Sequence, residues 1–204
     1  MDDAPIRVAY SLEQCWDPIP GEGATAALRI AAALRDRPAD VTVLQVVGKH
    51  ADLPTAAYRP VGSVAMLPLG RRWLYEAWTR LNWPKVESVT GTVDVAHATG
   101  FVPCGTSVPL VVTIDDIEFL DEAGSLPRHV ERMLRRSFDV IRERADRVLC
   151  SSEAIFDGCV RAGFDEAKLR LILVGLDADS KSAAEQTLAV YRELAPTGGG
   201  TADS

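Results

Sequence analysis

The chain has 204 residues, which suits one α/β domain and is too short for two such domains side by side. Hydrophobic residues make up 47% and charged residues 25%, which excludes a fibrous or wholly disordered chain. The net charge of −7 comes from 29 acidic residues against 22 Lys and Arg. It excludes a general nucleic-acid binder, because neutralising phosphates requires a basic face.

The start of the chain and its cysteines indicate a cytoplasmic protein. Met1 is followed by Asp2 and Asp3, the reverse of the basic start of a secretory signal. No apolar run reaches the ~18 residues that a membrane helix needs, so no transmembrane segment is expected. The cysteines form no CxxC pair and match no zinc motif. We expect free, buried thiols at Cys15, Cys104, Cys150 and Cys159.

The first half of the chain alternates between apolar and helical segments. In chain order, we expect a strand at 6–11, a helix at 24–35, a strand at 41–47, a weaker strand at 63–69 and a helix at 71–81. The strand segments are continuously apolar, as in sheets that are covered by helices on both faces.

The second half continues the same alternation. The expected elements are strands at 93–97 and 109–114, a helix at 128–144, a strand at 147–150, a helix capped at 151–152 that ends at 162, a strand at 169–174 and a helix at 182–194. Strands joined by helices predict an α/β fold with a single Rossmann-like, doubly wound parallel sheet and the first strand near its middle.

Four segments resemble, in order, motifs of the retaining GT-B glycosyltransferases related to sucrose synthase and bacterial mannosyltransferases. Residues 93–100 are similar to a DVVHAT strand and residues 109–117 to PLVVTVHDL. Residues 144–153 resemble ADRVIVPSE, and residues 169–177 resemble VRVVPNGVD. The resemblance implies the amino-terminal, acceptor-side half of a GT-B enzyme of the glycosyltransferase family 4 type.

The resemblance also implies a division of the chain. Residues 1–177 would form the GT-B amino-terminal domain, and residues 178–195 resemble the carboxy-terminal helix that crosses back onto it. Residues 196–204 are expected to be a flexible tail. The donor-binding domain would be missing, so the nucleotide sugar would be a co-substrate bound mainly elsewhere. No cofactor and no metal are expected, and transfer is expected only with a partner.

Candidate site residues follow the strands, at the carboxyl edge where open α/β sheets bind their ligands. Gly21 and Gly23 flank Glu22 just before a helix, where backbone amides can face an anion, although both glycines can also simply make the turn. The resemblance adds residues at or just after the ends of three further strands, which are His97, Thr99, Gly100, Asp115, Asp116, Ser152 and Glu153.

Asp115 departs from the family pattern, which usually has His at this place. A carboxylate cannot offer the neutral donor and acceptor pair of an imidazole, and two adjacent acids repel each other. Joint metal binding with Asp116 is not expected, because neighbours on an extended strand point to opposite faces. His97 has a second interpretation as a hydrogen-bonded structural residue, and Ser152 as a helix N-cap.

Tryptophans and basic residues gather in one short stretch, which contains Trp73, Trp78, Trp83, Arg71, Arg72, Arg80 and Lys85. This composition is typical of a membrane-interface or acceptor surface, which would give the protein a peripheral membrane contact. The alternative is that the tryptophans pack in the core and the basic residues form a solvated edge.

The sequence suggests three possible functions. The first is a half-enzyme that binds a hydroxylated acceptor and needs a donor-domain partner protein. The alternative is a non-catalytic protein-binding or regulatory module, which would expose apolar residues at the former cleft. A dehydrogenase is disfavoured, because Ala26 replaces the third glycine of G-x-G-x-x-G and no acid ends the strand at 41–47.

Overall fold

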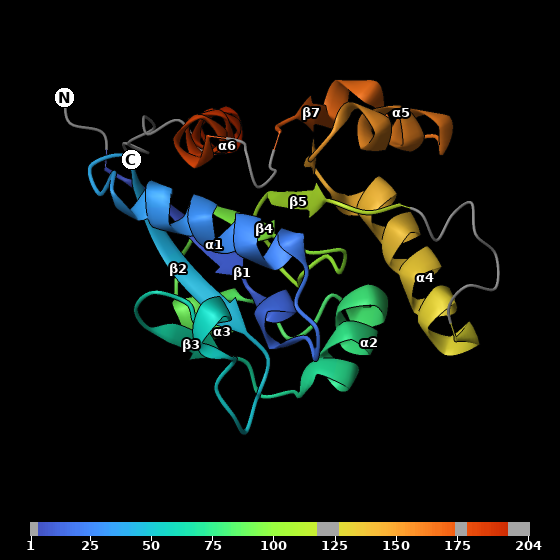
Figure 1. Ribbon diagram of the computed structural model, residues 1–204, viewed down its shortest axis with the longest axis horizontal. Coiled ribbons are helices and arrows are strands. Elements are labelled where there is room, and N and C mark those ends of the chain that lie inside the picture. The colour runs from blue at the N-terminus through green and yellow to red at the C-terminus, as the bar shows by residue number, and fades with distance from the viewer. Residues whose placement is uncertain (1–3, 118–126, 174–178, 196–204) are drawn as a thin grey trace, which may run out of the picture.

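Seven parallel strands form one sheet in a computed structural model, which describes residues 4–117, 127–173 and 179–195 (Figure 1). In chain order the strands are β1 (Ile6–Ser11), β2 (Val41–Val47), β3 (Val64–Met66), β4 (Val95–Ala98), β5 (Leu110–Ile114), β6 (Arg147–Cys150) and β7 (Leu169–Leu171). Their order in space is β3-β2-β1-β4-β5-β6-β7, and every pairing is parallel. The predicted fold class is confirmed, and β1 lies beside the central strand β4.

The helices follow the predicted chain order. They are α1 (Glu22–Arg35), α2 (Arg71–Leu81), α3 (Glu87–Thr90), α4 (Arg128–Arg144), α5 (Glu153–Arg161) and α6 (Ser180–Leu194), with short 3-10 turns η1 (Glu13–Trp16), η2 (Ala56–Tyr58) and η4 (Glu166–Lys168). α6 begins two residues before the predicted start, because the carboxylate of Asp179 accepts a hydrogen bond from the N–H of Lys181 and caps the helix.

The last strand is shorter than predicted. We expected a strand at 169–174, but β7 ends at Leu171, and Leu173 is 57% exposed. β7 lies at the edge of the sheet with β6 as its single neighbour, so only one side of the strand is held by a ladder of hydrogen bonds. The predicted division between 177 and 178 and the predicted tail at 196–204 lie outside the described residues.

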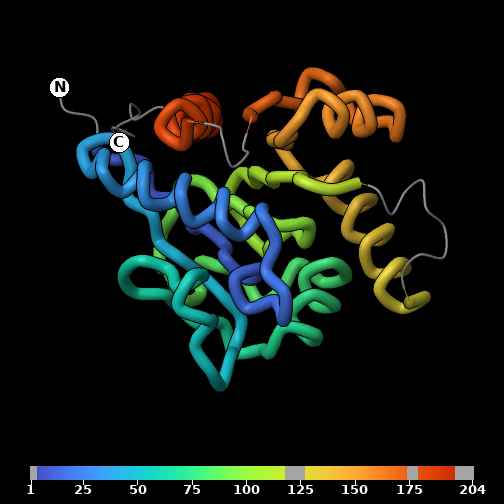
Figure 2. The backbone as a smooth tube through the Cα atoms, viewed as in Figure 1, coloured from blue at the N-terminus to red at the C-terminus, as the bar shows by residue number. Residues whose placement is uncertain are grey.

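α6 packs beside α1 on one face of the sheet (Figure 2). Leu188 is 1% exposed and Tyr191 is completely buried. The Tyr191 hydroxyl lies 2.6 Å from Nδ1 of His97 on β4, which ties the last described helix to the centre of the sheet. The prediction that residues 182–194 lie against the sheet is confirmed.

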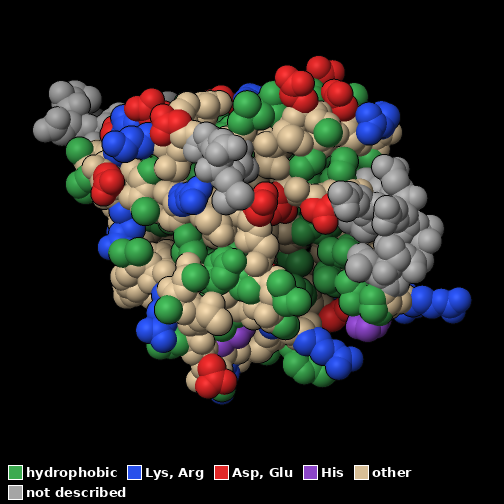
Figure 3. All heavy atoms as spheres, viewed as in Figure 1, with side chains coloured by type: hydrophobic (Ala, Val, Ile, Leu, Met, Phe, Trp, Pro, Cys, Tyr) green, Lys and Arg blue, Asp and Glu red, His purple; other side chains and the backbone are tan. Residues whose placement is uncertain are grey.

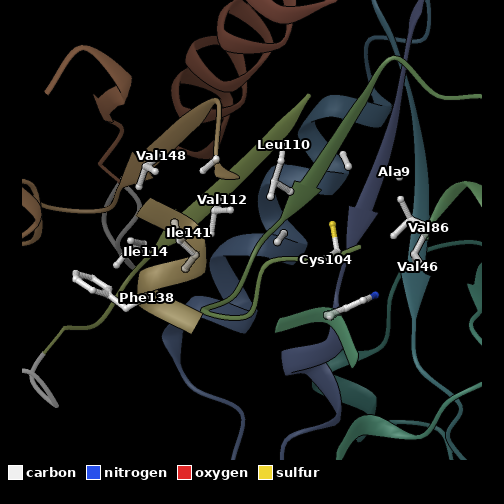
Figure 4. Packing of buried hydrophobic residues seen from close by; sticks show 14 of the residues in the cluster. Ala9, Val46, Val86, Cys104, Leu110, Val112, Ile114, Phe138, Ile141 and Val148 are labelled. Carbon is white, nitrogen blue, oxygen red and sulfur yellow. The ribbon is translucent and has the colours of Figure 1, made fainter. Parts of the chain in front are cut away.

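The other face of the sheet is covered by α2, α3, α4 and α5. Figure 4 shows the packing of Val112 and Ile114 of β5 with Phe138 and Ile141 of α4. The four cysteines are buried and free, as predicted. The two apolar layers cover both faces of the sheet, so the loops at its carboxyl edge remain open to solvent.

The tryptophans around α2 do not share one environment. Trp78 is 1% exposed, and its indole N–H donates to the carbonyl of Pro84 at 2.8 Å. Trp73 and Trp83 are 68% and 52% exposed. Core packing is therefore correct for Trp78 and wrong for the other two.

Replacing Leu188 with alanine should reduce the free energy of unfolding by about 2–5 kcal/mol, because it leaves a cavity between α6, α1 and the sheet. Gln186→Ala, on the exposed side of the same helix, is the control and should change stability by less than about 0.5 kcal/mol. Urea unfolding measures both variants. Equal stability of the two would show that α6 adds little to the fold.

Candidate functional site

The strand order reverses between β1 and β4, and the loops that follow these strands are fastened to each other. The side-chain amide of Gln14 donates to the carbonyl of Thr99 at 3.0 Å and to its hydroxyl at 2.6 Å. The Thr99 hydroxyl in turn donates to the carbonyl of Ser11. Ligands of open α/β sheets bind at such a reversal, so these bonds position Gln14 at the expected site.

Two adjoining pockets open at this point of the carboxyl edge. Both are lined by Gln14, Asp17, Gly100, Phe101 and Leu134. The first, which we call the acidic pocket, measures about 220 Å³ and is also lined by Gly21, Gly23, Ala24, Asp115 and Asp116. The second, the aromatic pocket, measures about 230 Å³ and is also lined by Ser11, Glu13, Arg71, Tyr75, Trp78, Val102 and Met133.

A third, larger pocket of about 360 Å³ lies between residues 15–20 and residues 50–55. None of the predicted site residues lines it. The candidate site is therefore the pair of pockets at the strand reversal, although the larger pocket lies close by and also includes Asp17.

In the acidic pocket, the carboxylate of Asp115 lies directly against Gly23 in the first turn of α1. A Cβ added at Gly23 would overlap Oδ2 of Asp115, so only glycine permits this approach. Burial raises the pKa of Asp115, its own backbone N–H partly opposes the rise, and the neighbouring Asp116 adds to it. Figure 3 shows acidic side chains near the centre of this face of the molecule.

In the aromatic pocket, Arg71 forms an ion pair with Asp17. It also donates to the Tyr75 hydroxyl at 3.2 Å, and its guanidinium carbon lies 5.4 Å from the centre of the Tyr75 ring. Burial raises the pKa of Asp17, and the neighbouring guanidinium opposes that rise. This pocket thus combines a paired cation with aromatic and aliphatic walls.

The structure brings together Gly21, Gly23, Gly100, Asp115 and Asp116 as pocket-lining residues. Thr99 borders a small cavity of about 20 Å³ together with Gly23 and Asp115. Thr99 is buried and fastens Gln14, while Glu22, Ser152 and Glu153 line neither pocket. Ser152 caps α5, because its hydroxyl accepts the N–H of Ile155 at 3.3 Å. Ligand contacts by these residues stay predictions.

His97 lies behind the site. Its ring is 1% exposed, with one nitrogen 2.6 Å from the Tyr191 hydroxyl and the other 2.8 Å from Oγ1 of Thr113. Burial lowers the pKa of His97 to about 3, so the ring is neutral at physiological pH. These contacts support a structural role for His97, and a ligand contact by His97 stays a prediction.

Sequence reasoning missed Gln14, Asp17 and Phe101, which lie in the loops after β1 and β4. Their position at the strand reversal was the available signal. Met133 and Leu134 of α4 also line the aromatic pocket. Within the described residues, no three His, Cys, Asp or Glu side chains are grouped as metal ligands would be.

Asp115→Asn should stabilise the fold at pH 7. Burial raises the folded-state pKa of Asp115. The full free energy of unfolding is therefore present below the ordinary pKa of 3.8, where the carboxyl is protonated. Stability is lost as the pH rises through the folded-state pKa, because the buried carboxyl then has to ionise. A neutral amide avoids this loss. Urea unfolding at several pH values should show an advantage at pH 7 that shrinks toward pH 3.8. Asp157→Asn, on the exposed side of α5, is the control, and a pH-independent difference would contradict the expectation.

Similar folds occur in solved glycosyltransferase structures, whereas no curated protein matches the chain. HepE of Anabaena in complex with UDP-glucose is 19% identical over 84% of this chain and 44% of that chain, with a TM-score of 0.48. The HepE complex with UDP and glucose is 17% identical over 84% and 45%, with a TM-score of 0.47. The chain thus spans less than half the length of HepE.

A sucrose-phosphate synthase structure from Thermosynechococcus elongatus is 17% identical over 93% of this chain and 98% of that chain. Its TM-score is 0.52, and the likeness concerns the fold. The family described as Glycosyltransferase Family 4 matches residues 23–180, which is more than half of the sequence. With its GT-B-like parallel sheet, the chain belongs to Glycosyltransferase Family 4.

Proposed function

We propose that this chain forms the acceptor-side half of a sugar-nucleotide-dependent glycosyl-transfer site. The observation that carries the proposal is the pair of pockets at the strand reversal of a Glycosyltransferase Family 4 domain. Carboxylates of Asp17 and Asp115 and the amide of Gln14 offer partners for hydroxyl groups. Phe101 and Leu134 supply apolar surface beside them, which suits a hydroxylated acceptor.

The carboxyl edge also carries exposed apolar side chains. Ile19 follows β1, Leu53 follows β2 and Leu173 follows β7, with exposed fractions of 90%, 67% and 57%. Because the strands are parallel, all three residues lie on the edge that holds the pockets. Exposed apolar groups there support the docking of a donor-binding domain or partner protein.

Such a partner would hold the nucleotide sugar and supply the second wall of the reaction site. Without it, the groups that stabilise the leaving diphosphate and fix its position relative to the acceptor are absent. The chain is therefore inactive alone in this proposal. Its four buried, free thiols suit the reducing cytoplasm.

The proposed division into a domain at 1–177 and a returning helix at 178–195 draws support from the packing of α6. Its buried face covers α1 and β4 of a domain whose other elements precede it in the chain.

A peripheral membrane contact is a second candidate function, favoured by a patch on α2 and the loop after it. Trp73, Leu81 and Trp83 are 68%, 71% and 52% exposed, and the exposed basic residues among them are Arg72, Arg80 and Lys85. Tryptophan favours the bilayer interface, and basic side chains attract anionic lipids. None of the helices in the described part of the chain has the length and apolar character of a bilayer span.

A non-catalytic binding module is the alternative to the half-enzyme. It would use the same exposed apolar edge but would not need the two pockets to hold an acceptor. Acceptor binding in the pockets therefore separates the two functions.

The purified chain should transfer no sugar from UDP-glucose to a set of mono- and disaccharides, because the donor-binding wall is absent. The same saccharides should shift the NMR signals of the Gly100 and Phe101 amides, and Gln14→Ala should weaken this binding. Gln186→Ala on the exposed side of α6 is the matched control. Transfer by the chain alone would overturn the half-enzyme, and unshifted pocket signals would favour the binding module.

The chain should co-sediment with vesicles that contain phosphatidylglycerol and much less with phosphatidylcholine vesicles. Replacing Trp73 and Trp83 with alanine should weaken binding at least about tenfold, because both indoles leave the interface. Met66→Ala, at an exposed apolar residue of β3, is the control. Equal sedimentation of the double variant and the native chain would contradict the membrane contact.

A further inference from the structure

We propose that the acidic pocket selects uncharged hydroxylated ligands over phosphorylated ones, and that Asp115 is the residue that makes this choice. The inference deepens the proposed function and rests on it, since it names the chemical class that the acceptor side accepts. It also assigns Asp115 a role in specificity. Three features of the pocket carry it.

The first feature is the start of α1. Gly21 is the N-cap residue and provides no side-chain hydrogen bond to the first turn of this 14-residue helix. The N–H groups of such a turn attract anions, as does the helix dipole. In an open pocket, this turn would favour a phosphate.

The second feature is that a carboxylate already lies at this turn. Asp115 comes from the end of the neighbouring strand β5, and a Cβ added at Gly23 would come within 2.9 Å of its Cγ and overlap its Oδ2. The carboxylate therefore occupies the position beside Gly23 that a side chain would take, and its charge has the same sign as that of a phosphate. A phosphate would have to displace this carboxylate and also approach its charge.

The third feature is the balance of charge around the pocket. Asp17, Asp115 and Asp116 line it, and no Lys, Arg or His is among the described residues that do. Arg71 offsets the charge of Asp17 from the adjoining pocket, whereas no ion pair of Asp115 occurs in the described residues. Burial and the neighbouring Asp116 raise the pKa of Asp115, and its own backbone N–H partly opposes the rise.

The groups that remain suit a neutral polyol. A carboxylate accepts hydrogen bonds from hydroxyl groups without a change in charge, and Gln14 is held in place by Thr99 so that its amide oxygen faces Gly100. Phe101 and Leu134 lie beside these polar groups and can contact the C–H face of a sugar ring. The pocket therefore offers acceptors and apolar surface, and none of its described lining residues is a cation that could bind a phosphate.

Titrations of the whole chain with D-glucose and with inorganic pyrophosphate, at one fixed ionic strength, test this inference. The amide NMR signals of Gly21, Gly23 and Gly100 report on the pocket. In the native chain, glucose should shift them saturably and pyrophosphate should not. Asp115→Ala removes the charge and opens the space at Gly23, so pyrophosphate should bind at least about tenfold more tightly than to the native chain.

Asp115→Asn keeps the shape of the side chain and should give a smaller gain, which also provides the answer if the alanine variant does not fold. Asp157→Ala, at an exposed acid of α5, controls for the loss of one negative charge and should bind pyrophosphate no better than the native chain. Saturable pyrophosphate binding by the native chain at Gly23 would overturn the inference. So would the absence of a gain in a folded Asp115 variant.

The two proposals fail in different ways. If glucose does not bind but the Asp115 variants gain pyrophosphate binding, the role of Asp115 is supported and the saccharide-binding site is contradicted. If glucose binds and pyrophosphate binds equally well to the native chain, the acceptor site stands and the selection against phosphate is wrong.

Discussion

The parallel pairing of β1 with β4 is the constraint on which the rest of this structure depends. It joins Val8 to Val95 and Ser11 to Ala98, and it reverses the order in which the strands are added. From β1 the chain continues to β2 on one side, and from β4 it continues to β5 on the other side. The loops after β1 and β4 therefore diverge and leave a crevice between them at the carboxyl edge. The hydrogen bonds of Gln14 and Thr99 join the two loops at this crevice, and both pockets open beside them.

The face of the sheet behind the site is closed by α6. Its apolar stripe covers α1, and Tyr191 reaches the ring of His97, 94 residues earlier in the chain. Burial of this pair leaves a neutral imidazole with both nitrogens hydrogen-bonded, which satisfies the polar groups under the site. His97 thus supports the carboxyl edge from behind, while the residues that line the pockets come from loops.

Asp115 shows how a local conflict can shape a site. Its burial raises the free energy of the ionised form, yet the adjacent turn of α1 is a favourable place for an anion. Gly23 allows the carboxylate to come that close, since any Cβ would occupy the same space. The family resemblance implies His at this position, so a carboxylate that accepts hydrogen bonds lies where an imidazole could both donate and accept.

The sequence by itself determined the elements and the class of the fold. The helices at 71–81 and 128–144 have the predicted bounds, and Ser152 caps α5 as its position suggested, because helical spacing and capping depend on residues a few positions apart. Continuous apolar strands joined by helices were enough to predict the parallel sheet, and they placed Gly21, Gly23, Gly100, Asp115 and Asp116 at one edge.

Only the tertiary structure decided which side chains meet. The residues around His97 do not predict its contact with Tyr191, and those around Asp17 do not predict its ion pair with Arg71, because both contacts join segments far apart in the chain. The early end of β7 also depends on the tertiary structure. The apolar composition of 169–174 predicts a longer strand, but β7 lies at the edge of the sheet and pairs with β6 alone, so hydrogen bonds hold it on one side only. Short-range spacing fixes local conformation, whereas burial, charge pairing and pocket shape depend on how the finished layers pack.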